Sequence, residues 1–397
     1  MTANSLKKIP SFVTNLFICG VASSLMAFVL MPQIAKIEEL NLNLALLTVL
    51  ILGLGVYTIL KIAVIIEETT SILKDKVKIA GGLLQAVGTA FPDMIIGVVA
   101  AIASVQAESP DKKLAFAIIA AAATFGSNIY NIGFGAWCVW RQNCANHKGQ
   151  KVKMFVYFGK DVTPMSHHSA IPRLAELDNA NKLLTGLSIL TFATSILMVG
   201  FGTHTSPSLD AAYKAMNGGD LYQLSPFSGL LLILAAGYTI YKFRHNTSEE
   251  SETDEHNPFA SQSIIVTILA LLISGVFIYL TASSMVQAVE HITHLTKFPL
   301  VLAGALSGLI GCLGEMVVVH NFTTNPKGKI GDSLVGIAMD NIITLMGASI
   351  VAILGGVFLG GADLIIIFCG VLFLNTILLL QISTLKNEYV DARHKKV

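Results

Sequence analysis

Charged residues are scarce in this chain of 397 residues, since Asp, Glu, Lys and Arg together make up 13% of it. An ordinary soluble domain carries about 25% charged residues, whereas 53% of the residues here are hydrophobic. The deficit excludes an ordinary soluble domain and predicts a membrane protein with several spans. The formal net charge of +1 is too small to indicate a nucleic-acid partner, and none is expected.

Cysteine is also scarce and shows no paired spacing of the kind that binds zinc. The five cysteines are Cys19, Cys138, Cys144, Cys312 and Cys369. We therefore expect neither a zinc site nor a disulfide framework. The sequence also lacks a phosphate-binding loop of the Gly-x-x-x-x-Gly-Lys-Ser/Thr kind, so ATP-driven chemistry is not indicated. We expect no enzymatic activity and no cofactor.

Long apolar runs are abundant, and ten of them are long enough to cross a bilayer. The fold class predicted from them is all-α, a polytopic membrane protein with about ten transmembrane helices. The ten runs are Phe12–Met31, Leu44–Ile66, Ile79–Val105, Leu114–Trp140, Leu183–Phe201, Leu221–Tyr241, Ile264–Val289, Phe298–His320, Leu334–Leu359 and Leu364–Ile382.

Basic residues are distributed unevenly between the loops. If the N-terminus is cytoplasmic, twenty of the 26 Lys and Arg residues lie in cytoplasmic segments and five lie outside. This asymmetry predicts an integral protein of the cell membrane with both termini in the cytoplasm. Lys61 lies within a span, where its side chain is expected to reach the cytoplasmic headgroups near Tyr57.

The ten runs group into one extra first span, a first repeat of five spans and a second repeat in which four of the five spans are present. The predicted organisation is an extra N-terminal transmembrane helix in residues 1–36, a first membrane repeat in 42–243 with a cytoplasmic loop at 141–182, an acidic cytoplasmic linker in 244–262, a second membrane repeat in 263–385 and a cytoplasmic tail in 386–397. Because five spans is an odd number, the second repeat should be inverted relative to the first.

Two spans carry an acid in similar surroundings, Gly88-Thr89-Ala90-Phe91-Pro92-Asp93 and Gly311-Cys312-Leu313-Gly314-Glu315. Each is followed by a span with a polar motif, Gly126-Ser127-Asn128-Ile129-Tyr130-Asn131 and Met339-Asp340-Asn341-Ile342-Ile343-Thr344. An unpaired charge at the bilayer centre costs at least ~2.5–3.5 kcal/mol, so such acids point to function. Two inverted copies predict one site that is built from two half-sites.

The residues around these acids favour a hard cation. Pro92 cannot donate to the carbonyl of Gly88, so a carbonyl oxygen should be freed one turn before Asp93. Small residues on one face of each acid-bearing span would allow close approach of another helix, although such faces also serve plain packing. Carboxylate, amide, hydroxyl and carbonyl oxygens are the ligands that Ca²⁺ and similar ions require.

The pattern Gly-Thr-x-x-Pro-acid followed by Gly-Ser-Asn-Ile-aromatic-Asn, present twice and inverted, resembles the alpha repeats of the sodium/calcium exchanger family within the cation/calcium antiporter superfamily. The resemblance implies that the motif acids, the final Asn and neighbouring Thr and Ser oxygens bind the cations. Carried over by position, the predicted ligands are Asp93, Thr89, Ser127, Asn128 and Asn131 from the first repeat and Glu315, Gly311, Cys312, Asp340, Asn341 and Thr344 from the second.

The chain departs from the family pattern in several places. Asp93 replaces the usual Glu, Asp340 stands where Ser is usual, and Thr344 stands where Asn or Asp is usual. One span precedes the first repeat and one is missing after the second, so we expect Phe12–Met31 to pack where the missing helix would lie. The departures leave the selectivity between ions open.

The resemblance implies a secondary-active antiporter that exchanges Ca²⁺, or a similar divalent cation, for Na⁺ or H⁺ by alternating access. Two alternatives remain: an aspartyl intramembrane protease built on Asp93 and Asp340, or a passive cation channel. The expected partners are small inorganic cations and the lipid bilayer, and a monomer is compatible with the sequence.

Overall fold

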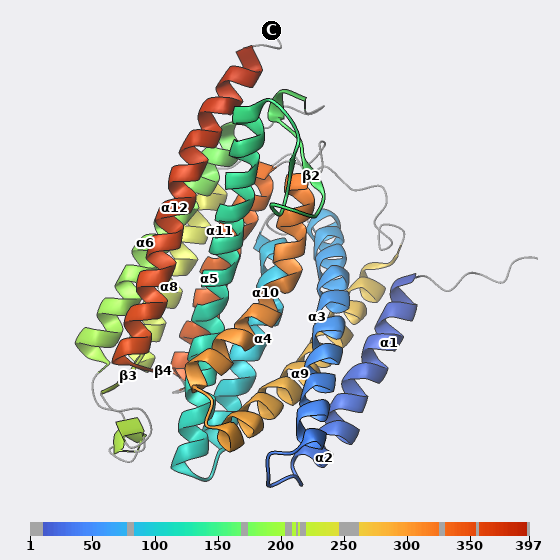
Figure 1. Ribbon diagram of the computed structural model, residues 1–397, viewed down its shortest axis with the longest axis vertical. Helices are drawn as coiled ribbons and strands as arrows, with labels where there is room; N and C mark the ends of the chain where they lie inside the picture. The colour runs from blue at the N-terminus through green and yellow to red at the C-terminus, as the bar shows by residue number, and fades with distance from the viewer. Residues whose placement is uncertain are drawn as a thin grey trace, which may run out of the picture.

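The computed structural model describes residues 11–77, 83–167, 174–202, 209–211, 213–214, 220–245, 262–324, 330–354 and 357–394. Figure 1 shows a bundle of long helices, in agreement with the all-α prediction. The α-helices are α1 (Ser11–Leu25), α2 (Met31–Ile34), α3 (Leu42–Val77), α4 (Leu83–Gln106), α5 (Pro110–Lys148), α6 (Leu174–Phe201), α8 (Pro226–His245), α9 (Ile264–Thr296), α10 (Leu300–Thr324), α11 (Ile330–Ile353) and α12 (Gly361–His394). A π-helix, η1 (Met26–Leu30), joins α1 to α2, and a 3-10 helix, η2 (Met165–His167), precedes α6.

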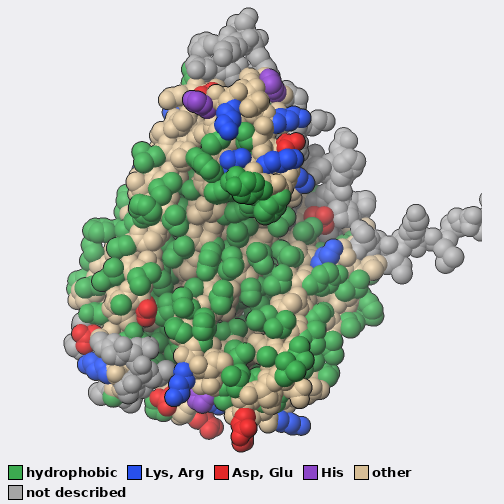
Figure 2. Space-filling view, viewed as in Figure 1, with side chains coloured by type: hydrophobic (Ala, Val, Ile, Leu, Met, Phe, Trp, Pro, Cys, Tyr) green, Lys and Arg blue, Asp and Glu red, His purple; other side chains and the backbone are tan. Residues whose placement is uncertain are grey.

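Nine helices of the described part are long and apolar enough to cross a membrane, and α4 adds a shorter apolar stretch at Met94–Gln106. All ten predicted runs therefore correspond to helices. Figure 2 shows hydrophobic side chains over the middle of the visible face, with most charged side chains near its two ends. This distribution is the one expected of a molecule whose middle faces lipid.

Helix ends differ from the predicted boundaries because hydropathy does not report where a helix leaves the lipid. The loop predicted at 141–182 is shorter, since α5 continues to Lys148 and α6 already begins at Leu174. The tail predicted at 386–397 is largely helical, because α12 continues to His394. Most of the predicted acidic linker, residues 246–261, lies outside the described residues.

Two short antiparallel ribbons interrupt the helical pattern. The strands β1 (Val152–Lys153) and β2 (Asp161–Val162) pair with each other, and β3 (Leu221–Gln223) pairs with β4 (Phe358–Gly360). The predicted spans were therefore too long, because Leu221–Tyr241 begins with a strand and Leu334–Leu359 ends within one. A short apolar run at the end of a span reads the same in hydropathy whether it is helix or strand.

The contacts between helices confirm that the two repeats are inverted. Gly97 of α4 faces Thr124 of α5, and Ser104 Oγ donates to Lys113 O at 2.7 Å, so contact positions rise along α4 as they fall along α5. These two helices are thus antiparallel. The corresponding contacts of α10 rise together with those of α5, from Gly304 against Ile119 to Glu315 against Asn131. Since α10 is parallel to α5, it is antiparallel to α4, its counterpart in the first repeat.

The expectation for the first helix is wrong. α8 packs against α6 and α11, so its missing counterpart would lie against α12 and α5. α1 instead packs against α3 and α9, and Figure 1 shows it on the opposite side of the bundle from α12. The contact is sequence-specific, because the ring of Phe277 on α9 lies over Gly20, where a Cβ would meet its Cζ at 2.6 Å.

Candidate cation site

The two spans with polar motifs are the most deeply buried of the candidate membrane spans. In the most apolar part of the span, 89% of the residues of α5 and 78% of those of α11 are buried, against at most 39% in the other seven spans. Among the nine candidate spans of the described part, α5 and α11 therefore keep most of their polar side chains away from lipid. Their partners at the centre of the bundle are α4 and α10.

Asn131 joins the two halves of the molecule at this centre. Its amide Nδ2 donates to Oδ2 of Asp340 at 3.0 Å and also to Oε2 of Glu315. All three side chains are buried. The first repeat thus supplies an amide on α5, and the second repeat supplies two carboxylates on α10 and α11. The two repeats thus bring these three predicted ligands together, and their binding of a cation stays a prediction.

The charge of this centre is not balanced by the amide. Two carboxylates that share one donor lie close enough to repel each other when both are ionised. A neutral amide supplies hydrogen bonds but no positive charge, and removing two charges from water costs several kcal/mol per ion unless they are compensated. A bound cation, or protons on the carboxylates, would relieve this repulsion.

Oxygen atoms around the three residues are available as ligands. Four buried side-chain oxygens within about one helical turn of Asn131 or Asp340 along α5 and α11 have no hydrogen-bond partner among the described residues. They are Oδ1 of Asn128, Oδ1 of Asn131, Oδ1 of Asn341 and Oγ1 of Thr344. A buried polar atom without a partner costs about 1–3 kcal/mol, and such atoms commonly mark a site for a water or an ion. Ca²⁺ takes 6–8 oxygen ligands of these types.

Other predicted ligands are engaged within their own helices. Ser127 Oγ donates to Thr124 O at 2.9 Å, and Cys312 Sγ donates to Leu309 O at 3.3 Å. The Nδ2 atom of Asn341 donates to Ile337 O at 2.8 Å, which leaves its Oδ1 as the free acceptor. A Ser hydroxyl that donates to its own helix still has lone pairs to offer a cation. Cys312 contributes a soft sulfur, which a hard cation does not favour.

Small residues explain why α5 and α10 come so close at this level. A Cβ on Gly304 would lie 2.6 Å from Ala122 Cβ and 2.9 Å from Ile119 O, and a Cβ on Gly308 would lie 3.0 Å from Ser127 N. The Gly-x-x-x-Gly spacing puts both glycines on one face of α10, so the two backbones meet directly. Glu315 follows Gly308 by about two turns on the same helix, which brings its carboxylate to the level of Asn131.

Asp93, the first motif acid, belongs to α4, and this helix packs against α5, α10 and α11. Pro92 is inside α4 and buried, and it borders the cavity that reaches Glu315. The side chains of Asp93 and Thr89 lie outside the described residues, so their role as ligands stays a prediction. Among the side chains that the structure describes, no group of three or more His, Cys, Asp or Glu residues is arranged to hold a metal.

A cavity of about 520 Å³ borders Glu315. It lies between α3 and α10, and its wall runs from Gly311 and Glu315 to Asn321 and Phe322 near the end of α10. Lys61 of α3 lines the same cavity. Sequence reasoning found Lys61 only as a residue near Tyr57, and its ammonium does lie 5.9 Å from that ring. Whether Lys61 and Glu315 line one cavity depends on how α3 crosses α10, and hydropathy does not report this crossing.

Comparisons with known proteins support the fold. No protein-family model and no curated protein matches the chain. Among solved structures, the fold is similar to that of the H⁺/Ca²⁺ exchanger CAX, with a TM-score of 0.55 and 15% identity over 97% of this chain and 98% of that one. Native YfkE is similar with a TM-score of 0.55 and 15% identity over 95% of this chain and 98% of that one. The resemblance to cation/calcium exchangers is thus confirmed at the level of the fold.

Proposed function

We propose that this protein is a secondary-active antiporter that exchanges Ca²⁺, or a divalent cation of similar chemistry, for H⁺ or Na⁺ by alternating access. One observation carries the proposal. Asn131 from the first repeat donates to both Glu315 and Asp340 from the second, so two buried carboxylates of one half meet an amide of the inverted half.

The charge of the centre supports exchange. A divalent ion neutralises both carboxylates at once, and two protons or two monovalent cations do the same. The two kinds of occupant compete for the same oxygens, so the centre holds one or the other. An empty centre holds two buried carboxylates that repel each other when ionised, which discourages movement without cargo. Rocking of one repeat against the other then exposes the same site to each side of the membrane in turn.

Protons are the first counter-ion to test. Protons can neutralise the carboxylates of Glu315 and Asp340 without further ligands, and one of the structures of similar fold is an H⁺/Ca²⁺ exchanger. The site also offers the amide and hydroxyl oxygens that Na⁺ would use, so Na⁺ remains the second counter-ion.

The decisive experiment is uptake of labelled Ca²⁺ into proteoliposomes, with outward H⁺ and Na⁺ gradients imposed separately. Wild-type protein should take up Ca²⁺ only when a counter-ion gradient is present. Glu315→Gln and Asp340→Asn should each reduce exchange by at least about 100-fold, because each removes one of two charges that a divalent ion needs at close range. The variants should still insert and fold, since the replacement amides keep the shape of the acids.

The matched control is Glu290→Gln, the same substitution at another buried acid, on α9. It should leave exchange near the wild-type rate. Wild-type exchange by Glu315→Gln would contradict the proposed site. Ca²⁺ flux that needs no counter-ion on the opposite side would indicate a channel instead of an antiporter. Cleavage of a membrane substrate that depends on Asp340 would indicate the protease alternative.

A further inference from the structure

The hairpin between α5 and α6 carries an apolar tip that the protein itself leaves uncovered. Val156 is 55% exposed, Tyr157 is 92% exposed and Phe158 is 67% exposed. These three consecutive residues form the turn between β1 and β2, and they lie outside every candidate membrane span of the described part. Exposed apolar side chains are usually scattered singly over a protein surface, whereas two aromatic rings and a valine lie together at this tip.

The tip is held in place by hydrogen bonds, so its exposure is a property of a defined structure. Met154 N donates to Lys160 O at 2.9 Å, and Phe155 N donates to Phe158 O at 3.1 Å. Gly159 has a φ of 96°, a conformation that favours glycine, and it allows the chain to turn here. The rings of Phe155 and Phe158 stack with centroids 5.0 Å apart.

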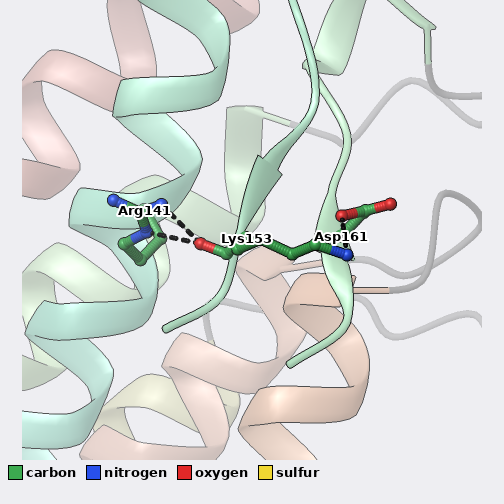
Figure 3. Close-up of polar contacts among 3 residues, drawn as sticks. All are labelled: Arg141, Lys153 and Asp161. Carbon is green, nitrogen blue, oxygen red and sulfur yellow. Dashed lines mark hydrogen bonds and ion pairs between the residues drawn. The ribbon is translucent and has the colours of Figure 1, made fainter. Parts of the chain in front are cut away.

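The base of the hairpin is fastened to the end of α5. Trp137 Nε1 donates to Met154 O at 3.1 Å, and the Nε atom of Arg141 donates to Lys153 O at 2.8 Å. Lys153 also forms an ion pair with Asp161 across the two strands at 2.9 Å, as Figure 3 shows. The strands therefore cannot turn freely about α5, and the direction of the tip is set by the fold.

The hairpin lies at the depth of a membrane interface. The ring of Phe155 stacks on His320 of α10 with centroids 6.4 Å apart, and Lys160 Nζ donates to Asn321 Oδ1 at 3.4 Å. Val317, which is 50% exposed on the surface of the same spanning helix, lies four residues before Asn321, or about 6 Å along the axis. The tip thus lies close to the end of a helix whose outer surface faces lipid.

Positive charge surrounds the tip. Residues 148–161, which form the hairpin and the turn before it, contain four basic residues and one acid, Asp161. The basic residues are Lys148, Lys151, Lys153 and Lys160. Figure 2 shows Lys and Arg side chains around a hydrophobic group in the upper part of the molecule, over the hairpin seen in Figure 1. Aromatic side chains flanked by lysines are typical of segments that bind an anionic membrane surface.

We propose that the hairpin tip Val156–Phe158 docks into the leaflet beside it, with its lysines on anionic lipid headgroups. The aromatic rings enter the region between headgroups and acyl chains, and the ammonium groups stay at the surface. Since Phe155 and Lys160 contact α10, the docked hairpin also holds the end of the helix that carries Glu315. The proposal concerns lipid binding and stands independently of the transported ion.

The test is a depth measurement by spin labelling of the full chain in vesicles. A nitroxide at Tyr157→Cys, in a protein whose five native cysteines are replaced, is compared with a nitroxide at Lys151→Cys near the base. In vesicles that contain phosphatidylglycerol, the label at 157 should be more accessible to oxygen than to a water-soluble nickel complex. The label at 151 should show the reverse order. Replacing Lys148, Lys151 and Lys160 with Gln should move the label at 157 toward water.

Two outcomes would overturn the proposal. If the label at 157 is as accessible to the nickel complex as the label at 151, the tip faces the aqueous phase and is available to a soluble protein instead. If its depth is the same in pure phosphatidylcholine as with phosphatidylglycerol, anionic headgroups have no part in docking. Because cysteine at 157 could disturb the turn, quenching of native Trp137 and Trp140 by brominated lipid is measured in the unsubstituted chain. It should be stronger in vesicles that contain phosphatidylglycerol, and equal quenching in both lipids would also count against the proposal.

Discussion

At the scale of single residues, the site is distinguished by polar atoms that have no hydrogen-bond partner. The Nδ2 atom of Asn131 donates to two carboxylates, while its Oδ1 accepts no hydrogen bond from the described residues. Thr344 Oγ1 is buried one turn after Asp340 and is in the same situation. In a core built for stability alone, such atoms would be replaced by apolar groups of the same shape. Their presence fits a site whose partner is a cation.

Thr344→Val removes one such oxygen and keeps the shape of the side chain. We expect the apparent affinity for Ca²⁺ to fall by about tenfold, equivalent to 1.4 kcal/mol. The cation-free protein should be as stable as the wild type, or more stable by up to about 1–3 kcal/mol, because an unsatisfied hydroxyl is lost. Calorimetric titration with Ca²⁺ and thermal unfolding in detergent measure the two effects.

Thr323→Val is the matched control, since Thr323 on α10 donates its hydroxyl to Val319 O at 2.8 Å and is satisfied within its helix. It should leave the Ca²⁺ affinity unchanged. If Thr344→Val binds Ca²⁺ as tightly as Thr323→Val does, Thr344 is not a ligand.

At the scale of elements, the crossing of α5 and α10 decides whether the carboxylates can meet the amide. The helices touch through Gly304, Gly308 and the small residues of α5, with backbone atoms in direct contact. A lipid-embedded interface gains little from the hydrophobic effect, so close packing of this kind supplies much of the attraction between helices.

Gly304→Ala should force the two helices apart, because its Cβ would lie 2.9 Å from Ile119 O and 3.0 Å from Ile119 Cα, both backbone atoms that cannot move aside. Overpacking of a tight interface costs about 1–3 kcal/mol, and we expect a lower unfolding temperature together with weaker Ca²⁺ exchange.

Gly237→Ala on α8 is the control, as no atom outside the helix's own backbone lies within 4 Å of the added Cβ. It should be neutral or stabilising by up to about 1 kcal/mol, the difference in helix propensity. Equal unfolding temperatures for the two variants would show that the α5–α10 contact is looser than described.

At the scale of the whole molecule, the side of the membrane that each end of the bundle faces depends on orientation. The cavity at Glu315 extends to Asn321 and Phe322, at the end of α10 where the basic hairpin also lies. The distribution of Lys and Arg predicts that this end is cytoplasmic.

A cysteine at Lys36, between α2 and α3, should therefore react with a membrane-impermeant maleimide in intact cells. A cysteine at Lys151 should react only after permeabilisation. Both positions are exposed, so burial does not account for a difference. Unsubstituted protein measures the background from native cysteines. The reverse pattern of labelling would show that the orientation is opposite to the predicted one, with the hairpin end of α10 on the outside.

Much of the architecture could be predicted because it follows from transfer of side chains into lipid. The hydropathy of each apolar run is enough to predict that the run enters the bilayer. An acid such as Glu315 stands out within such a run even when its spatial neighbours are unknown. The inversion followed from counting five spans. The strand Leu221–Gln223 was missed because an apolar run carries no information about whether its backbone hydrogen bonds lie within a helix or across to Phe358–Gly360.

Contacts between distant parts of the chain could not be predicted in the same way. The sequence indicated Asn131 as a ligand, but not that its amide donates to two carboxylates 184 and 209 residues away. Lys61 gave no sign of lining a cavity with Glu315. The predicted position of α1 was wrong. The repeat symmetry of the resembled family suggested that α1 replaces the missing last helix, whereas α1 packs against α3 and α9, with Phe277 of α9 over Gly20.

By itself, the sequence determined that this is a membrane protein of about ten helices, with acids and amides inside two inverted repeats, because hydropathy and motif spacing are local properties of the chain. Only the tertiary structure decided which of these groups meet. It brought Asn131 between Glu315 and Asp340, opened a cavity beside Lys61 and left the tip of the hairpin exposed. The physical reason is that helix packing through small residues is short-ranged, so its outcome depends on the shapes of surfaces that exist only after the chain has folded.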